Sequence, residues 1–223
     1  MFKRLINILL TILLVNCNYN IPKGDLPLAK EGIIDLRNID FSNSPDQVVD
    51  LDGSWVFIWN EFVNPNETEI LSKYSHYINV PSQWQKEKDS EGKTYPAQGY
   101  ASYYLKVLLP ENYPELSISM SDTGMAYSLY LNGELQSSNG KVGKSKEEME
   151  IRQKYAIFPI RDRTLRELNI IIHNSNFHYH KAGLWQRIRL GKTHVIEESH
   201  YHNIYIDLIV ASCLFIMGLY HLG

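Results

Sequence analysis

The sequence contains only two cysteines in 223 residues, Cys17 and Cys213, and they lie near opposite ends of the chain. Each stands in or beside an apolar run, so we expect neither a disulfide framework nor a cysteine zinc site. Basic residues form no cluster, and the net charge is -3. A nucleic-acid-binding domain usually presents a concentrated basic surface, so we expect no nucleic-acid partner.

The sequence also lacks the residue patterns that catalysis and metal binding require. Its carboxylates fall in no motif that would hold a pair across a bond to be cleaved. The glycines near Gly140 follow a predicted hairpin rather than opening a helix after a strand, unlike a phosphate-binding loop. His178 and His180 would share one face of a strand, but no nearby carboxylate or cysteine completes a metal shell. We therefore predict no catalysis, no metal and no cofactor.

The N-terminus has the pattern of an export signal over residues 1–17. Lys3 and Arg4 precede an apolar run from Leu5 to Val15, which is too short to span a bilayer comfortably. The run stops just before Cys17, which resembles the lipobox of bacterial lipoproteins, where the cysteine is acylated. Asn16 departs from the small residue usual at that position. Acylation of Cys17, a plain cleaved signal and an uncleaved anchor therefore stay open as alternatives.

The C-terminus carries a second apolar run, from Leu208 to Leu222, without a charged residue. A helix needs about 20 apolar residues to cross a bilayer, and the chain ends before the run reaches that length. The run has no polar face, which favours a membrane helix over a buried amphipathic one. We expect residues 204–223 to begin a first transmembrane helix. The segment between the two ends would then lie outside the cytoplasm, in the periplasm.

Short strand patterns separated by turn residues fill the middle of the chain. Residues 18–50 predict a linker with an early strand near Gly32–Ile39, and residues 51–198 predict one domain. Asn132-Gly133 predicts a tight hairpin, and Lys144–Gln153 is the one charged helix candidate. Many short strands favour a mainly β fold, a β-sandwich. The expected strands are Trp55–Trp59, His76–Val80, Ser102–Leu109, Leu116–Met120, Tyr127–Leu131, Glu134–Ser137, Tyr155–Ile160, Leu168–His173 and Trp185–Leu190.

The order of several short motifs resembles two known groups of proteins. One set resembles the jelly-roll sugar-binding domain of family 2 glycoside hydrolases, and consists of Leu51-Asp52-Gly53-Ser54-Trp55, Val80-Pro81-Ser82-Gln83-Trp84, Gly99–Tyr104, Leu131–Glu134, Asn174 and Gly183-Leu184-Trp185. The chain is still more similar to the exported domain of bacterial seven-transmembrane receptors with diverse intracellular signalling modules. The motifs that carry this second resemblance are Trp55–Trp59, Tyr95–Ala101, Gly140–Ser145 and Gly218–His221.

The resemblance spans residues 50–223 and implies a galactose-binding-like jelly-roll sandwich between a signal helix and a transmembrane helix. It implies a sensor of a small-molecule or carbohydrate ligand that signals through a bundle of membrane helices. It also allows a homodimer formed through the receptor. The kinase, cyclase or phosphatase output modules of that family are absent from this sequence. Two alternatives stay open: a non-catalytic carbohydrate-binding module of a glycoside hydrolase-like protein, and a surface lipoprotein adhesin.

Aromatic and amide side chains near loops are the candidate ligand contacts. Trp84 lies near Pro81 and Trp185 near Gly183, and binding residues concentrate in loops. A tryptophan face can stack on a sugar ring, but its large apolar area also suits a core, and both alternatives stay open for these two. For Trp55 we expect core packing. The candidate ligand-binding residues are Trp84, Tyr100, Tyr104, Asn176 and Trp185.

Overall fold

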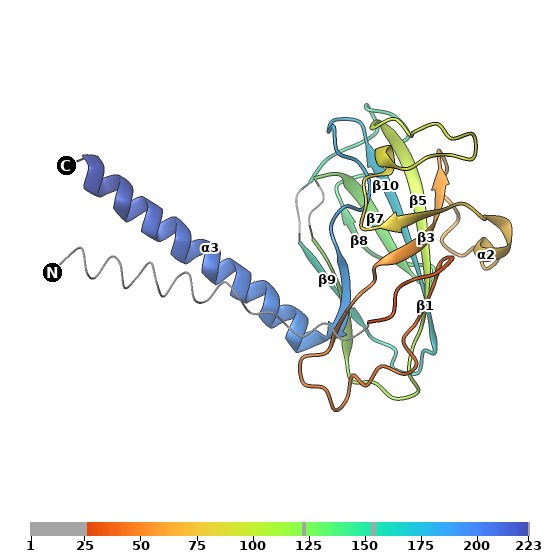
Figure 1. The fold of residues 1–223 in the computed structure, drawn as a ribbon, viewed down its shortest axis with the longest axis horizontal. Coiled ribbons are helices and arrows are strands. Elements are labelled where there is room, and N and C mark those ends of the chain that lie inside the picture. Colours follow the sequence, from red (N-terminus) through yellow and green to blue (C-terminus); the bar gives the residue numbers. More distant parts are fainter. Residues whose placement is uncertain (1–25, 122–123, 153–154, 223) are drawn as a thin grey trace.

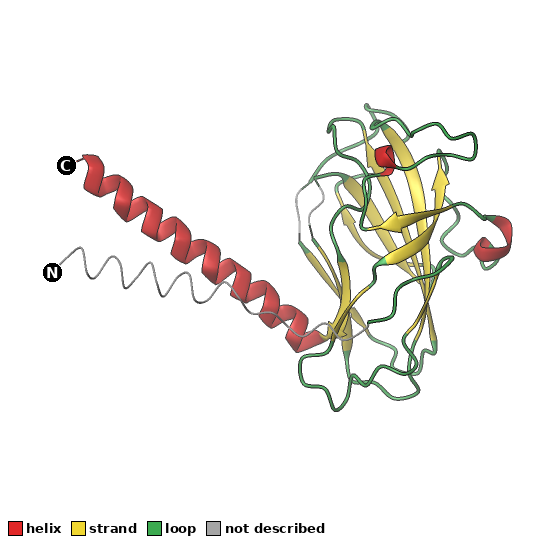
Figure 2. Cartoon of the chain, in the orientation of Figure 1, coloured by secondary structure: helices red, strands yellow, loops and turns green. Residues whose placement is uncertain are grey.

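The computed structural model describes residues 26–121, 124–152 and 155–222. Two β-sheets pack face to face, and one long helix extends from them at the C-terminus (Figures 1 and 2). The predicted mainly β sandwich with an apolar C-terminal helix is therefore confirmed. The export signal and Cys17 lie outside the described residues.

The larger sheet has seven strands. Neighbouring strands in it are antiparallel, except that β1 pairs with β5 in parallel. The order is β4-β3-β5-β10-β7-β8, with β1 alongside β5 beyond the end of β3. Its strands are β1 (Ile33–Asp35), β3 (Gly53–Trp59), β4 (Tyr77–Val80), β5 (Gly99–Leu108), β7 (Ala126–Leu131), β8 (Glu134–Asn139) and β10 (Glu167–Asn176).

The smaller sheet has four antiparallel strands in the order β2-β11-β6-β9. Along β11 and β6, apolar residues that face the core alternate with Arg189 and Ser119, which lie on the outer face. The strands are β2 (Val48–Asp50), β6 (Leu116–Met120), β9 (Ala156–Ile160) and β11 (Ile188–Lys192).

Strand β3 is apolar on both faces because both faces are covered. Trp55 and Phe57 point into the main core between the sheets. Val56 lies on the opposite face in a second cluster, under Ile70 of the short helix α2 (Ile70–Lys73). The run of apolar residues in this strand thus reflects burial on two sides rather than a membrane or a helix.

Two local predictions had opposite outcomes. The hairpin at Asn132-Gly133 is confirmed, with φ of 48° and 85° at the two residues and strands β7 and β8 on either side. The helix at Lys144–Gln153 is wrong, because the described residues 144–152 form turns and irregular backbone. Lys141 and Glu150 close this segment into a loop with two backbone hydrogen bonds of 2.8 and 3.0 Å.

Helix α3 (Thr193–Leu222) begins directly after β11. Ile196, in its first turns, is buried, whereas the apolar side chains farther along are exposed, with 68% of Phe215 accessible. Residues Thr193–Leu219 are long and apolar enough to cross a membrane. The predicted strand Trp185–Leu190 starts later than expected, at Ile188, so Trp185 lies in the preceding loop.

Candidate ligand-binding end of the sandwich

Two long loops, residues 81–98 and 177–187, meet at the end of the sandwich opposite the start of α3 (Figure 1). The backbone N–H groups of Ser82 and Trp84 each donate to a carbonyl of the second loop at 2.9 Å. Gln85 adds two side-chain bonds, because its amide donates to one carbonyl of that loop at 2.6 Å and accepts from one of its N–H groups at 3.0 Å. The two loops therefore form one connected surface.

Trp84 lies beneath this surface rather than on it. It belongs to a short 3-10 helix, η1 (Trp84–Lys86), and its side chain is fully buried. Its indole Nε1–H donates to the Pro96 carbonyl at 2.9 Å, and its ring centroid is 5.2 Å from that of Trp59. With no accessible ring face, Trp84 supports the loops by packing and offers no surface on which a sugar can stack.

Asn176, at the end of β10, ties the loops to the sheet. Its side chain is fully buried, and its Nδ2 donates to the carbonyls of Ala97 and Tyr179 at 2.9 and 2.8 Å. Its Oδ1 accepts from the backbone N–H of Tyr179 at 3.0 Å. All three bonds are internal, so Asn176 positions both loops.

The second loop contributes two accessible aromatic rings at this end. Trp185 is half-buried, and the Lys181 ammonium lies 5.6 Å from the centre of its ring. Tyr179 is 41% exposed. The Trp185 ring with the Lys181 ammonium over it makes a surface that suits the C–H face and hydroxyl groups of a sugar.

Tyr100 and Tyr104 lie elsewhere, on the outer face of the larger sheet. Tyr104 is buried, donates its hydroxyl to Asn169 Oδ1 at 2.7 Å, and has its pKa raised to about 12 mainly by burial. Tyr100 is half-buried, with its ring centroid 4.9 Å from that of Phe62 and 6.0 Å from the Lys144 ammonium. The structure thus brings Trp84, Asn176 and Trp185 together and separates the two tyrosines from them.

His173 is a buried residue on the same outer face of the larger sheet. Its ring stacks on Phe62 with centroids 4.9 Å apart, and its Nε2 lies 2.9 Å from the Val63 carbonyl. Burial lowers its pKa, so the neutral ring donates from Nε2 to that carbonyl. Within the described ranges, no group of three or more His, Cys, Asp or Glu residues could hold a metal.

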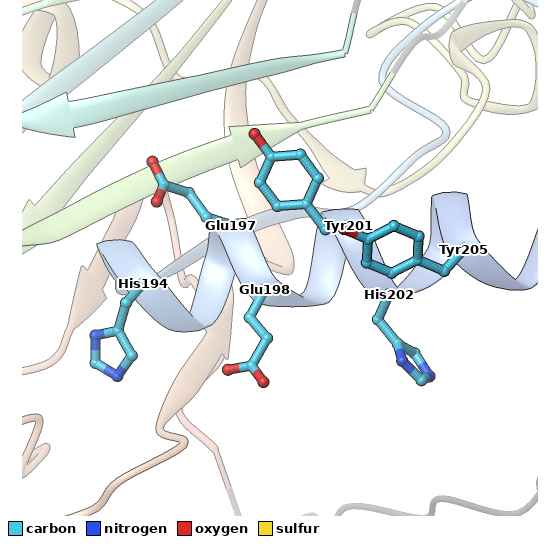
Figure 3. A pocket seen from close by; sticks show the side chains of 6 residues that line it. All are labelled: His194, Glu197, Glu198, Tyr201, His202 and Tyr205. Atoms are coloured by element: carbon cyan, nitrogen blue, oxygen red, sulfur yellow. The ribbon is translucent and has the colours of Figure 1, made fainter.

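A hollow of about 350 Å³ lies along the first turns of α3 (Figure 3). Every side chain that lines it comes from this one helix, so the part of the chain that the structure describes supplies no second wall to enclose a ligand. Its lining residues are His194, Glu197, Glu198, Tyr201, His202 and Tyr205.

A second hollow of about 260 Å³ lies where the edges of the two sheets meet at β8 and β9. Its lining includes the apolar residues Leu131, Ile160 and Leu168 and the charged residues Glu134 and Arg161. None of the predicted ligand contacts lines this hollow.

Sequence reasoning missed Tyr179 and Lys181. The available signal was the stretch from Phe177 to Trp185, which places aromatic, histidine and lysine residues directly after a long strand. The ring faces that this loop exposes could not be read from the sequence, because they depend on which side of the loop pairs with residues 82–84.

No protein-family model and no curated protein matches this chain. Among solved structures, it is similar to a β-glucuronidase from Faecalibacterium prausnitzii, with 14% identity, a TM-score of 0.50, and coverage of 67% of this chain and 32% of the enzyme. A β-glucuronidase from an uncultured Clostridium sp. has 15% identity, a TM-score of 0.48, and coverage of 67% and 29%. A glycosyl hydrolase family 2 member from Bacteroides cellulosilyticus has 15% identity, a TM-score of 0.48, and coverage of 65% and 20%.

The chain spans about a third or less of the length of these enzymes. At 14% identity, the likeness to the Faecalibacterium enzyme shows a shared sandwich fold and nothing about activity. It is consistent with the galactose-binding-like sandwich predicted from the motifs.

Proposed function

We propose that this chain is the extracytoplasmic, non-catalytic ligand-sensing part of a membrane signalling receptor, and that its ligand is a carbohydrate. The observation that carries the proposal is the direct passage from β11 into α3, with Lys192 ending the strand and Thr193 beginning the helix. A binding domain joined to a membrane helix without a linker is suited to passing a change in one to the other.

The membrane part of the proposal rests on the surface of α3. Its second half exposes a continuous apolar surface that includes Leu214, Phe215 and Ile216, which water solvates poorly. Tyr201 and Tyr205 stand just before this apolar half, and tyrosine is enriched where a helix enters the interface of a bilayer. The predicted export signal would leave the sandwich in the periplasm, and acylation of Cys17 would add a second anchor.

The carbohydrate part rests on the fold and on the exposed rings of the second loop. The sandwich is shared with an enzyme named as a β-glucuronidase, although this chain covers only 32% of that enzyme. We assign ligand contact to Trp185 and Tyr179, with Trp84 and Asn176 holding the loops beneath them. Tyr100, beside Phe62 and Lys144, would offer a separate stacking surface on the larger sheet.

A glycan array probed with the full chain in lipid nanodiscs tests the ligand class. We expect one family of glycans to bind, and Trp185→Ala to weaken that binding about tenfold or more, because burial of a large apolar side chain contributes about 1.5 to 3 kcal/mol. Leu135→Ala is the matched control, because Leu135 is an exposed apolar residue on β8, away from the loops. Absence of glycan binding, or equal loss in both variants, would refute carbohydrate sensing at this end.

The non-catalytic module of a glycoside hydrolase-like protein is the alternative that the fold likeness also supports. It predicts the same glycan binding but no coupling to the helix. Hydrogen exchange of residues 193–207, with and without the bound glycan, separates the two proposals. Slower exchange on binding favours the receptor, and unchanged exchange favours the module.

A further inference from the structure

A cavity of about 190 Å³ lies between the outer face of the smaller sheet and the first turns of α3. Strands β6 and β11 and the segments beside them form one wall, and α3 forms the other. Its lining residues are Ser119, Ser121, Tyr155, Gln186, Arg187, Arg189, Ser199 and Asn203. Every one of these side chains carries a hydrogen-bonding group, so the cavity is polar on all sides.

Most of these polar groups are uncommitted. Among the residues that the structure describes, the side chains of Ser119, Ser121, Gln186, Ser199 and Asn203 make no hydrogen bond to protein. Donors and acceptors from the sandwich and from the helix therefore converge on one space without satisfying each other. A ligand with several hydroxyl groups could pair with them from both sides.

The charges around the cavity favour a neutral ligand. Arg187 pairs with Asp50 at 3.3 Å and with Asp52 at 3.2 Å, and Arg189 pairs with Asp50 through its Nε at 3.4 Å. Among the described residues, these two guanidinium groups face two carboxylates, so the charges of this ion-pair cluster balance. The terminal amino groups of Arg189 lie outside this ion pair and still offer N–H donors.

Contacts on either side of the cavity hold the helix against the sheet. The rings of Tyr155 and His200 stack with centroids 3.8 Å apart and an interplanar angle of 3°. At the start of α3, the hydroxyls of Ser117 and Thr193 lie 2.9 Å apart, and Ile196 is buried. The cavity therefore sits inside the joint between the sandwich and the helix.

We infer that this cavity binds a small neutral polyhydroxylated molecule, of the monosaccharide or polyol class, whose hydroxyls bridge β6 and β11 to α3. Its volume of about 190 Å³ is below the range of about 300 to 1,000 Å³ typical of larger ligands, which favours a single ring over an oligosaccharide. The inference rests on the proposed function in taking this chain as a ligand sensor, and it adds a second site that touches the helix directly.

Titration calorimetry on the full chain in nanodiscs tests this site with glucose, galactose and myo-inositol as neutral probes. Glucuronate and inorganic phosphate serve as anionic probes. The variant Ser199→Ala/Asn203→Ala removes the polar groups of the helix wall, and alanine preserves the helix. His202→Ala is the matched control, because His202 neighbours Asn203 but lines the other hollow (Figure 3).

We expect at least one neutral probe to bind saturably and to slow hydrogen exchange over residues 193–205. The double alanine variant should weaken this binding at least about tenfold, while His202→Ala leaves it unchanged. Tighter binding of glucuronate or phosphate, failure of every neutral probe, or unchanged binding in the double variant would overturn the inference. If any of these results overturns the cavity inference, loss of glycan binding in Trp185→Ala would still support the proposed function. Failure of the cavity inference can therefore be distinguished from failure of the proposed function.

Discussion

Replacing Trp84 with phenylalanine tests whether this tryptophan supports the loop end or contacts the ligand. The structure places the indole in the core, with its Nε1–H bonded to the Pro96 carbonyl at 2.9 Å and its ring beside those of Trp59 and Phe57. Phenylalanine keeps an aromatic ring at the site but removes the N–H donor and part of the ring volume. A supporting role therefore predicts loss of stability, whereas a contact role predicts loss of binding.

The expected cost has two parts. Leaving the Pro96 carbonyl without its donor costs about 1 to 3 kcal/mol. The smaller ring leaves a cavity of a few tens of Å³, which at about 24 cal/mol per Å³ adds about 1 kcal/mol. A total of about 2 to 4 kcal/mol lowers the melting temperature of a domain of this size by roughly 4 to 16 °C.

Thermal unfolding of the full chain in detergent, followed by near-ultraviolet circular dichroism, measures this change. Trp185→Phe is the matched control, because Trp185 is half-buried and its replacement should cost less than about 1 kcal/mol. A Trp84→Phe protein with an unchanged melting temperature and weakened ligand binding would refute the supporting role.

Three further substitutions test other parts of the structure. In Gly99→Ala the new Cβ would overlap the indole ring of Trp59, so we expect a clear fall in melting temperature. Gly92→Ala meets no atom within 4 Å and should cost only the backbone strain of its positive φ. Asn176→Ala removes three hydrogen bonds between the loops and β10, so it should lower the free energy of unfolding by about 2 to 4 kcal/mol. Backbone hydrogen exchange over residues 177–187 should become faster, and an unchanged exchange rate there would contradict the positioning role of Asn176. Burial lowers the pKa of His173 below its usual 6.5, so the unfolded chain takes up this proton at a higher pH than the folded protein. The contribution of His173 to the free energy of unfolding should therefore be full above about pH 6.5, fall as the pH drops below that value, and level off below the pKa of the folded protein. Urea titrations at several pH values measure this dependence, and His173→Gln should flatten it.

Strands and turns could be predicted where the local order of apolar, polar and turn-forming residues indicates them directly. Strand β6 has the predicted bounds, Leu116–Met120, because its alternation of apolar residues and serine separates a face in the core from a polar face that α3 covers. The turn at Asn132-Gly133 was predictable because few residue pairs adopt positive φ at both positions. Strand β2 was missed because its three residues are too few to show an alternation.

The roles of the candidate site residues could not be predicted as well, because they depend on contacts between distant segments. Pro81 correctly indicated a loop around Trp84, but the pairing of that loop with residues 182–184 is what buries the indole. Asn176 lies at the end of a strand, and nothing nearby in sequence shows that its amide would bond to Ala97. Local patterns thus placed these residues in the right segments without showing which side chains stay accessible.

In the proposed receptor, β11 is the shortest structural path from the ligand-binding loops to the membrane helix. The second loop ends just before Ile188, and the five residues of β11 span about 17 Å before α3 begins. The strand is hydrogen-bonded to β2 on one side and to β6 on the other, and the Lys192 ammonium donates to the Ser42 carbonyl at 3.2 Å. Because no flexible linker follows, a ligand that reorders residues 177–187 acts on one end of a rigid element whose other end is the first turn of the helix. The polar cavity beside this path lies where a second ligand would strengthen or weaken the same joint.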